Sequence, residues 1–200
     1  HADIALSRAK EEGRNGYRIF AADIAAQTLR AQELSNLLHG ALERNEFSLV
    51  YQPQVRLGSG RMVAVEALLR WTLPDGESIP PAQFIPEAER NGLIIPIGEW
   101  VLRTACRQSM AWRAQGLPPI RMAVNLAVQQ MFMPDFVRMV REILRETGLD
   151  PSSLELEITE GTAVREVGNI LRVLSELRSI GISIAIDDFG IEYSSLNRIK

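Results

Sequence analysis

Hydrophobic and polar positions follow two different periods in the first half of the chain. Between residues 21 and 44 the apolar positions recur at helical spacing, at Leu29, Leu34, Leu37, Leu38 and Leu42. Apolar residues that repeat every three or four positions predict an amphipathic helix. Residues 47–54 and 61–71 are instead strand-like runs separated by Gly58-Ser59-Gly60, and such a pair predicts a β-hairpin. The first half therefore predicts a connector helix followed by the first helix of a new domain, and then a hairpin.

From residue 100 onward, helical and strand patterns alternate. Helices are predicted over residues 100–113, 135–147 and 164–180, and strands are predicted to end at Asn125, near Glu157 and at Asp187. An alternation of strand and helix at about thirty residues per unit is typical of parallel βα repeats. The fold class is therefore α/β, and on this pattern alone a (β/α) barrel and an open doubly wound sheet both fit.

Composition restricts the class of protein further. The 200 residues are 46% hydrophobic and 24% charged, which is typical of a soluble globular domain. A formal net charge of −3 gives no general attraction to a nucleic acid polymer or to anionic lipid. The apolar stretches are shorter than the roughly 20 residues of a membrane span, and no signal peptide opens the chain. The single cysteine, Cys106, suits a core position in a reducing compartment, so we expect a cytoplasmic domain.

Oxygen-bearing side chains interrupt or end the predicted strands. Glu66 lies in an apolar run that we expect to be buried on both faces, where a carboxylate needs a cation partner or a proton. Asn125, Glu157 and the pair Asp187 and Asp188 end three successive strands. In a barrel the carboxyl ends of parallel strands meet at one mouth, and an all-oxygen set favours Mg²⁺ or Mn²⁺ over zinc. The alternative is that single acids cap the following helices, as Asp188 could.

The two ends of the chain predict elements without partners. Residues 1–20 read as a helix, a turn at Gly13-Arg14-Asn15-Gly16 and a short strand. A helical pattern that begins near Tyr193 continues to Lys200 without a stop signal. We therefore expect the chain to be a piece of a longer protein.

Six motifs follow one another between residues 38 and 200. They are Tyr51-Gln52-Pro53, Glu66-Ala67-Leu68-Leu69-Arg70-Trp71, Phe84-Ile85-Pro86-Glu87-Ala88-Glu89, Val124-Asn125 with Gln130, Leu156-Glu157-Ile158-Thr159-Glu160, and Asp187-Asp188-Phe189-Gly190 with Tyr193-Ser194-Ser195-Leu196. In order and spacing this set resembles the EAL domains, the bacterial cyclic di-GMP phosphodiesterases. The opening residues are similar to the closing helix and strand of a GGDEF domain. The resemblance implies a GGDEF–EAL tandem parent, with a GGDEF remnant at 1–20, a connector helix at 21–37 and an EAL domain at 38–200 that lacks its C-terminal part.

The resemblance also implies a fold, a reaction and a site. EAL domains are modified TIM (β/α)8 barrels with an antiparallel first strand, here truncated after about five strands, and they hydrolyse cyclic di-GMP to linear pGpG. The metal ligands implied by the matching motifs are Glu66, Asn125, Glu157, Asp187 and Asp188, around two cations that are Mg²⁺ or Mn²⁺. The implied catalytic residues are Glu66, Asp187, Asp188 and Glu160. The implied substrate-binding residues are Gln52, Glu66, Leu68, Arg70, Pro86 and Asn125.

Departures from the family pattern keep a second function open. Ile191 and Glu192 stand where the family has threonine and glycine, and Ala127 and Gly161 replace small polar residues. A catalytic lysine would fall beyond Lys200, so we expect this chain alone to be inactive. The alternative is a degenerate EAL domain that acts as a cyclic di-GMP receptor or protein-interaction module. A barrel of another class, an oxidoreductase or aldolase, would need a phosphate loop or Schiff-base lysine that we do not find.

Three expectations concern the parent protein. It is expected to form a homodimer through its EAL domain. An upstream sensory domain is compatible with this tandem arrangement. An upstream region could also tether it to a membrane.

Overall fold

A six-stranded mixed sheet organises the described part of this computed structural model, residues 22–159 and 167–187. The strand order is β1-β2-β4-β5-β6, with the short strand β3 paired to β2. The order increases along the chain without reversing, as in a (β/α) barrel, whereas a doubly wound sheet reverses its order at a switch point. The predicted α/β class is confirmed, and the barrel-like alternative holds.

The predicted hairpin is present. Strands β1 (Phe47–Val55) and β2 (Met62–Thr72) pair antiparallel around the glycine-containing turn, with a register shift between Gln54 and Val55. Strand β3 (Ser78–Ile79) adds a second antiparallel partner to the end of β2. Strands β1 and β3 therefore both run opposite to β2.

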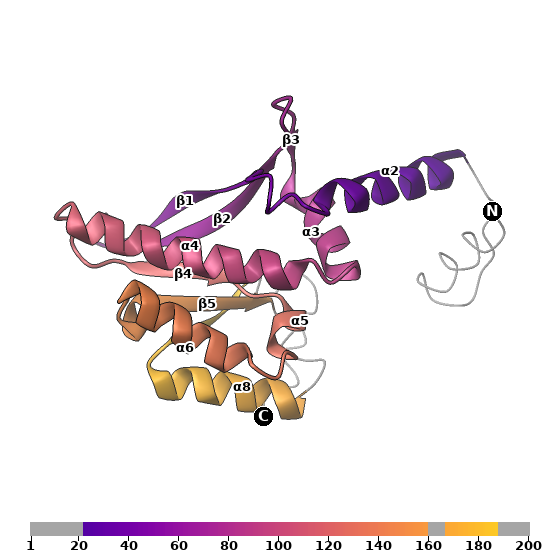
Figure 1. The fold of residues 1–200 in the computed structure, drawn as a ribbon. Helices are drawn as coiled ribbons and strands as arrows, with labels where there is room; N and C mark the ends of the chain where they lie inside the picture. The colour runs from indigo at the N-terminus through magenta and orange to yellow at the C-terminus, as the bar shows by residue number, and fades with distance from the viewer. Residues whose placement is uncertain (1–21, 160–166, 188–200) are drawn as a thin grey trace.

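The repeating units build the parallel part of the sheet. Strands β4 (Arg121–Asn125), β5 (Leu154–Thr159) and β6 (Ser183–Asp187) each pair parallel with the preceding long strand. Helices α4 (Ile94–Ala114), α6 (Phe136–Thr147) and α8 (Val167–Ile180) lie side by side along one face of these strands, as Figure 1 shows. The buried core includes Trp71, Met122, Leu154 and Leu156, all less than 2% exposed.

Several helices differ from the sequence prediction. Helix α4 begins at Ile94, six residues before the predicted start, because Pro96 lies in the first turn, where its missing N–H is not needed. Helix α3 (Pro81–Arg90), helix α5 (Val128–Met131) and the 3₁₀ turn at Pro151–Ser153 were not predicted. The predicted start of α8 at Val164 lies outside the described residues. No helix in the described part of the chain is long and apolar enough to span a bilayer.

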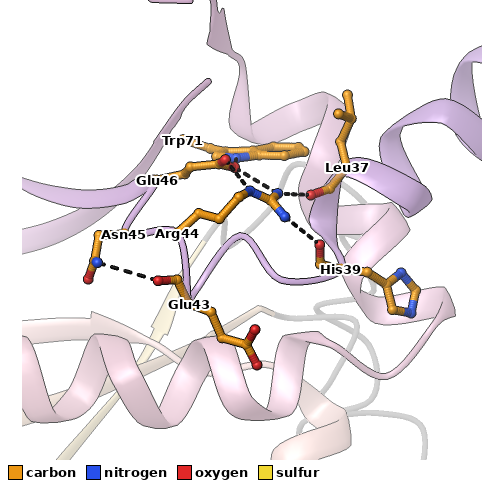
Figure 2. Close-up of polar contacts among 7 residues, drawn as sticks. All are labelled: Leu37, His39, Glu43, Arg44, Asn45, Glu46 and Trp71. Atoms are coloured by element: carbon orange, nitrogen blue, oxygen red, sulfur yellow. Dashed lines mark hydrogen bonds and ion pairs between the residues drawn. The ribbon is translucent and has the colours of Figure 1, made fainter. Parts of the chain in front are cut away.

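Helix α2 (Ala22–Leu38) ends six residues before the predicted helical stretch does, at a polar cluster shown in Figure 2. The chain turns at Gly40, whose φ of 78° is the left-handed conformation that favours glycine. The guanidinium of Arg44 donates to the carbonyl oxygens of Leu37, at 2.6 Å, and of His39, at 3.0 Å. Basic groups stabilise the exposed carbonyls at a helix C-terminus, so Arg44 caps the end of α2.

The same arginine ties α2 to the sheet. Arg44 pairs with Glu46, whose side chain is only 4% exposed, and Glu46 also accepts a hydrogen bond from the indole Nε1 of Trp71 at 3.0 Å. These contacts hold the pKa of Glu46 below its ordinary value, mainly through the hydrogen bond from Arg44. Trp71 lies in β2 and makes an edge-on contact with Phe84 of α3, with ring centroids 5.4 Å apart. We call Arg44, Glu46 and Trp71 the α2 anchor.

Candidate functional site

One face of the sheet carries the residues that were predicted to form a site. Side chains alternate between faces along a strand, and directly paired residues share a face. Gln52 pairs with Glu66 across the hairpin, and Asn125 pairs with Glu157 across the parallel strands. Asp187 pairs with Thr159, two residues beyond Glu157 on β5. The register therefore places these polar side chains on one face, near the carboxyl ends of β4, β5 and β6.

Three carboxylates converge on this face. Glu66, Glu157 and Asp187 each offer an oxygen, and these oxygens lie within 4.8 Å of one another. Asn125 joins them, because its amide Nδ2 donates to Glu66 Oε1 at 2.8 Å. We call Glu66, Glu157 and Asp187 the acidic cluster. The sequence predicted that these side chains would meet, and the structure brings them together.

The environment of Glu66 differs from the prediction. Its strand was expected to be buried on both faces, but Val65 and Ala67 are buried whereas Glu66 and Leu68 are only half-buried. On the face of Glu66, Ala64 is buried, and the face is more open from Glu66 onward. The expected full burial of Glu66 is therefore wrong, and the argument for a cation at this position rests mainly on its neighbours.

Glu157 is the most enclosed member of the acidic cluster. It is 8% exposed, and its pKa is raised to about 7, first by burial and then by the charges of Glu66 and Asp187. A hydrogen bond from the side chain of Gln54 opposes this rise. Crowded carboxylates that raise each other's pKa are stabilised when a cation lies among them. The donor set, three carboxylates and an amide, consists of the oxygen ligands that Mg²⁺ and Mn²⁺ prefer.

Gln54 is a site residue that the sequence analysis missed. It lies two positions after Gln52 on β1, so it shares the face of Glu66. The period of two in the strand was a sufficient signal to find it.

The predicted substrate-binding residues lie on two elements of the structure. Leu68 and Arg70 follow Glu66 at every second position of β2, so they share its face and lie toward the carboxyl end of that strand. Arg70 is half-buried, and its Nη1 donates to the carbonyl oxygen of Leu69 at 2.9 Å. Gln52 is exposed beside Glu66, and Pro86 is exposed within helix α3. The structure thus groups Gln52, Leu68 and Arg70 with Glu66, and it places Pro86 on a different element.

Other predicted site positions lie outside the described residues. They are Asp188 and Glu160 among the implied catalytic residues, Gly161, and the departures at Ile191 and Glu192. The predicted elements at 1–20 and after Tyr193 also lie outside the described residues.

Cys106 belongs to the core, as the sequence predicted. It is fully buried in α4, and burial raises the pKa of its thiol to about 12. A thiol of that pKa carries almost no thiolate at neutral pH, so it is a poor nucleophile.

Comparisons with known proteins identify the family of the chain. The EAL domain family matches residues 31–200. The bifunctional diguanylate cyclase/cyclic di-GMP phosphodiesterase MucR of Pseudomonas aeruginosa is 45% identical over 200 residues, which cover 100% of this chain and 29% of MucR. Signaling protein YkoW of Bacillus subtilis is 36% identical over 199 residues, 100% of this chain and 25% of YkoW. The chain therefore spans less than a third of the length of either relative.

Solved structures share the fold. The MucR phosphodiesterase in complex with c-di-GMP is 47% identical to this chain, with a TM-score of 0.77 over 82% of this chain and 67% of that structure. The FimX EAL domain from Pseudomonas aeruginosa, bound to c-di-GMP, is 26% identical, with a TM-score of 0.73 over 82% of this chain and 66% of that structure. On the family match over residues 31–200 and these likenesses, the chain belongs to the EAL domain family.

Proposed function

We propose that this chain is part of a cyclic di-GMP phosphodiesterase, which hydrolyses cyclic di-GMP to linear pGpG in bacterial second-messenger signalling. The observation that carries the proposal is the acidic cluster, whose three oxygens lie within 4.8 Å of one another at the carboxyl ends of the sheet. The likeness to the MucR phosphodiesterase, whose solved structure contains c-di-GMP, supports this substrate.

The proposed metal ligands are Glu66, Asn125, Glu157 and Asp187, with Asp188 added from the sequence motif. Divalent cations supply Lewis acidity: they neutralise charge on phosphoryl oxygens and make water a better nucleophile at neutral pH. The all-oxygen donor set fits Mg²⁺ or Mn²⁺, and we propose two such ions. Glu160, also from the motif, completes the proposed catalytic set with Glu66, Asp187 and Asp188.

The chain's own residues orient the cluster and the substrate. Asn125 donates from Nδ2 to Glu66, so its remaining polar atom, Oδ1, is the one left for a cation. Arg70 lies four positions after Glu66 on the same face of β2, and a guanidinium binds a phosphate through two parallel hydrogen bonds. Gln52 and Leu68 flank Glu66 on that face, and Pro86 completes the proposed substrate-binding set.

The alternative is a receptor that binds cyclic di-GMP without cutting it. A receptor does not need every metal ligand, and here Glu66, Asn125, Glu157 and Asp187 are all retained and adjacent. This favours the enzyme.

Nucleotide chromatography of cyclic di-GMP incubated with the full-length protein and Mg²⁺ tests the proposal. We expect pGpG to form, Glu66→Ala to remove most of the activity, and a chelator to abolish it. Asp135→Ala is the control, because Asp135 is an exposed carboxylate that pairs with Arg138. Full turnover in excess chelator or in Glu66→Ala would exclude the metal assignment, and binding without product would favour the receptor.

The proposal extends to the parent protein. Residues 1–20 are assigned to a GGDEF domain, 21–37 to a connector and 38–200 to the EAL domain, because the alignment with MucR, named as bifunctional, covers all 200 residues. We further propose that the parent protein forms a homodimer through its EAL domain and carries an upstream sensory domain. Its proposed location is the cytoplasm, and a membrane tether in the upstream region is compatible with that location.

A further inference from the structure

Gln130 has a buried side chain that contacts the backbone just after strand β4. Its Oε1 accepts a hydrogen bond from the backbone N–H of Ala127 at 3.0 Å, and the residue is only 2% exposed. A glutamine at the third position of a helix that reaches back to the N-cap amide forms one half of a capping box. Ala127, the N-cap, has no side-chain oxygen to form the other half. The cap of α5 therefore depends on Gln130.

The segment that Gln130 holds follows Asn125 directly. Strand β4 ends at Asn125, and the N-cap of α5 comes two residues later. Between them, Leu126 donates its backbone N–H to the carbonyl oxygen of Glu157 at 2.8 Å. The chain after Asn125 is thus held by two successive backbone donors, one bound to Glu157 and one to Gln130.

Gly98 of helix α4 provides the space for the Gln130 amide. A Cβ at position 98 would lie 2.8 Å from Oε1 of Gln130 and closer still to its Cδ and Nε2. Glycine is a poor helix former, so its place inside α4 needs a packing reason. The buried amide of Gln130 is that reason, because it has little room to move aside for a methyl group.

We propose that Gln130, seated against Gly98, is a positioning residue for Asn125 in the metal site. This inference rests on the proposed function, in which Asn125 is a ligand. Asn125 is held to Glu66 by one hydrogen bond from Nδ2, so the direction of its Oδ1 depends on the backbone that follows. Groups that orient a metal ligand from behind typically change metal affinity 10- to 100-fold when removed.

Calorimetric titration of the full-length protein with Mn²⁺ alone tests the inference. Gln130→Ala is expected to weaken Mn²⁺ binding about tenfold or more, and saturating Mn²⁺ is expected to restore most of kcat with little change in KM for cyclic di-GMP. Gly98→Ala, which displaces the same amide by adding a methyl group, is expected to weaken binding in the same direction. Gln129→Ala is the matched control, since its buried Oε1 has no hydrogen-bond partner among the described residues. We expect this control to keep the wild-type Mn²⁺ affinity.

A double-mutant cycle separates positioning of Asn125 from general destabilisation. If Gln130 acts through Asn125, Gln130→Ala in an Asn125→Ala background changes Mn²⁺ affinity by less than about twofold. Effects that multiply in the cycle, or wild-type Mn²⁺ affinity in both Gln130→Ala and Gly98→Ala, overturn the inference. A wild-type protein that binds no Mn²⁺ overturns the proposed function instead, so the two failures are distinguishable.

Discussion

Removing the carboxylate of Glu46 should measurably destabilise the domain. Glu46 is 7% exposed and accepts the indole N–H of Trp71, a residue with no exposed surface. Leaving a buried donor unpaired costs about 1–3 kcal/mol, and hydrogen bonds to charged groups contribute at the upper end of the usual range. We therefore expect Glu46→Ala to lower the free energy of unfolding by about 2–3 kcal/mol. Glu46→Gln keeps an acceptor for Trp71, so its loss should be smaller.

Urea unfolding followed by Trp fluorescence and circular dichroism is the assay. With a slope of about 2 kcal/mol/M, the loss in Glu46→Ala corresponds to a midpoint lower by about 1–1.5 M. Asp135→Asn is the control, because it breaks an ion pair with Arg138 in which both side chains are about two-thirds exposed, and we expect no measurable shift. A midpoint for Glu46→Ala within error of the wild type would refute the reasoning.

The pH dependence of the free energy of unfolding tests the α2 anchor in a second way. Because Arg44 and Trp71 hold the pKa of Glu46 below its ordinary value, the charged form stabilises the fold fully above the ordinary carboxyl pKa. That contribution is lost as the pH falls through the lowered pKa. The stability difference between wild type and Glu46→Gln should therefore be largest near neutral pH and vanish in acid.

Three further perturbations have defined outcomes. Arg70→Lys should raise KM for cyclic di-GMP at least about tenfold with a smaller change in kcat, because an ammonium cannot donate two parallel hydrogen bonds to one phosphate. An unchanged KM in steady-state kinetics would contradict this prediction. Mn²⁺ affinity should fall by up to about tenfold per pH unit below pH 7, since a cation must displace the proton from Glu157, whose pKa is about 7. Titrations in buffers of different ionisation enthalpy measure the proton that is released on Mn²⁺ binding. The Glu157→Gln variant should release no proton. Ala127→Ser supplies the missing side-chain oxygen at an N-cap that already has extended backbone angles, φ −77° and ψ 144°. It should raise the free energy of unfolding, measured by calorimetry, by about 1 kcal/mol. An unchanged melting temperature would show that the cap of α5 does not contribute to the stability of the domain.

Much of the fold could be predicted because its signals are local. The hairpin follows from two strand-like runs around a glycine turn, and the parallel strands follow from apolar runs that alternate with helical periods. The convergence of Asn125, Glu157 and Asp187 could be predicted because equivalent ends of parallel strands meet, whichever way the sheet curves.

The missed features depend on contacts between distant residues. Helix α3 contains Pro86, a residue that usually breaks a helix, yet Phe84 and Ala88 on the same helix are fully buried and hold it in place. The start of α4 includes Pro96 and Gly98, which look like a loop until the fit of Gly98 with Gln130 is known. The half-exposed state of Glu66 depends on which face of β2 the helices cover, and an apolar run does not show that.

The α2 anchor fixes the C-terminal end of helix α2 to the sheet. Leu34 and Leu38, near its end, are buried, whereas Leu29 is 62% exposed, so the far part of the helix lies outside the packed core, as Figure 1 shows. A force on that far part would act first on the pair of Arg30 with Glu77 and on the hydrogen bond from Asn91 to Ser35, and then on the carbonyl of Leu37 held by Arg44. Hydrogen bonds have a short range, so these contacts resist small displacements of the helix and break when the displacement is larger, instead of weakening gradually.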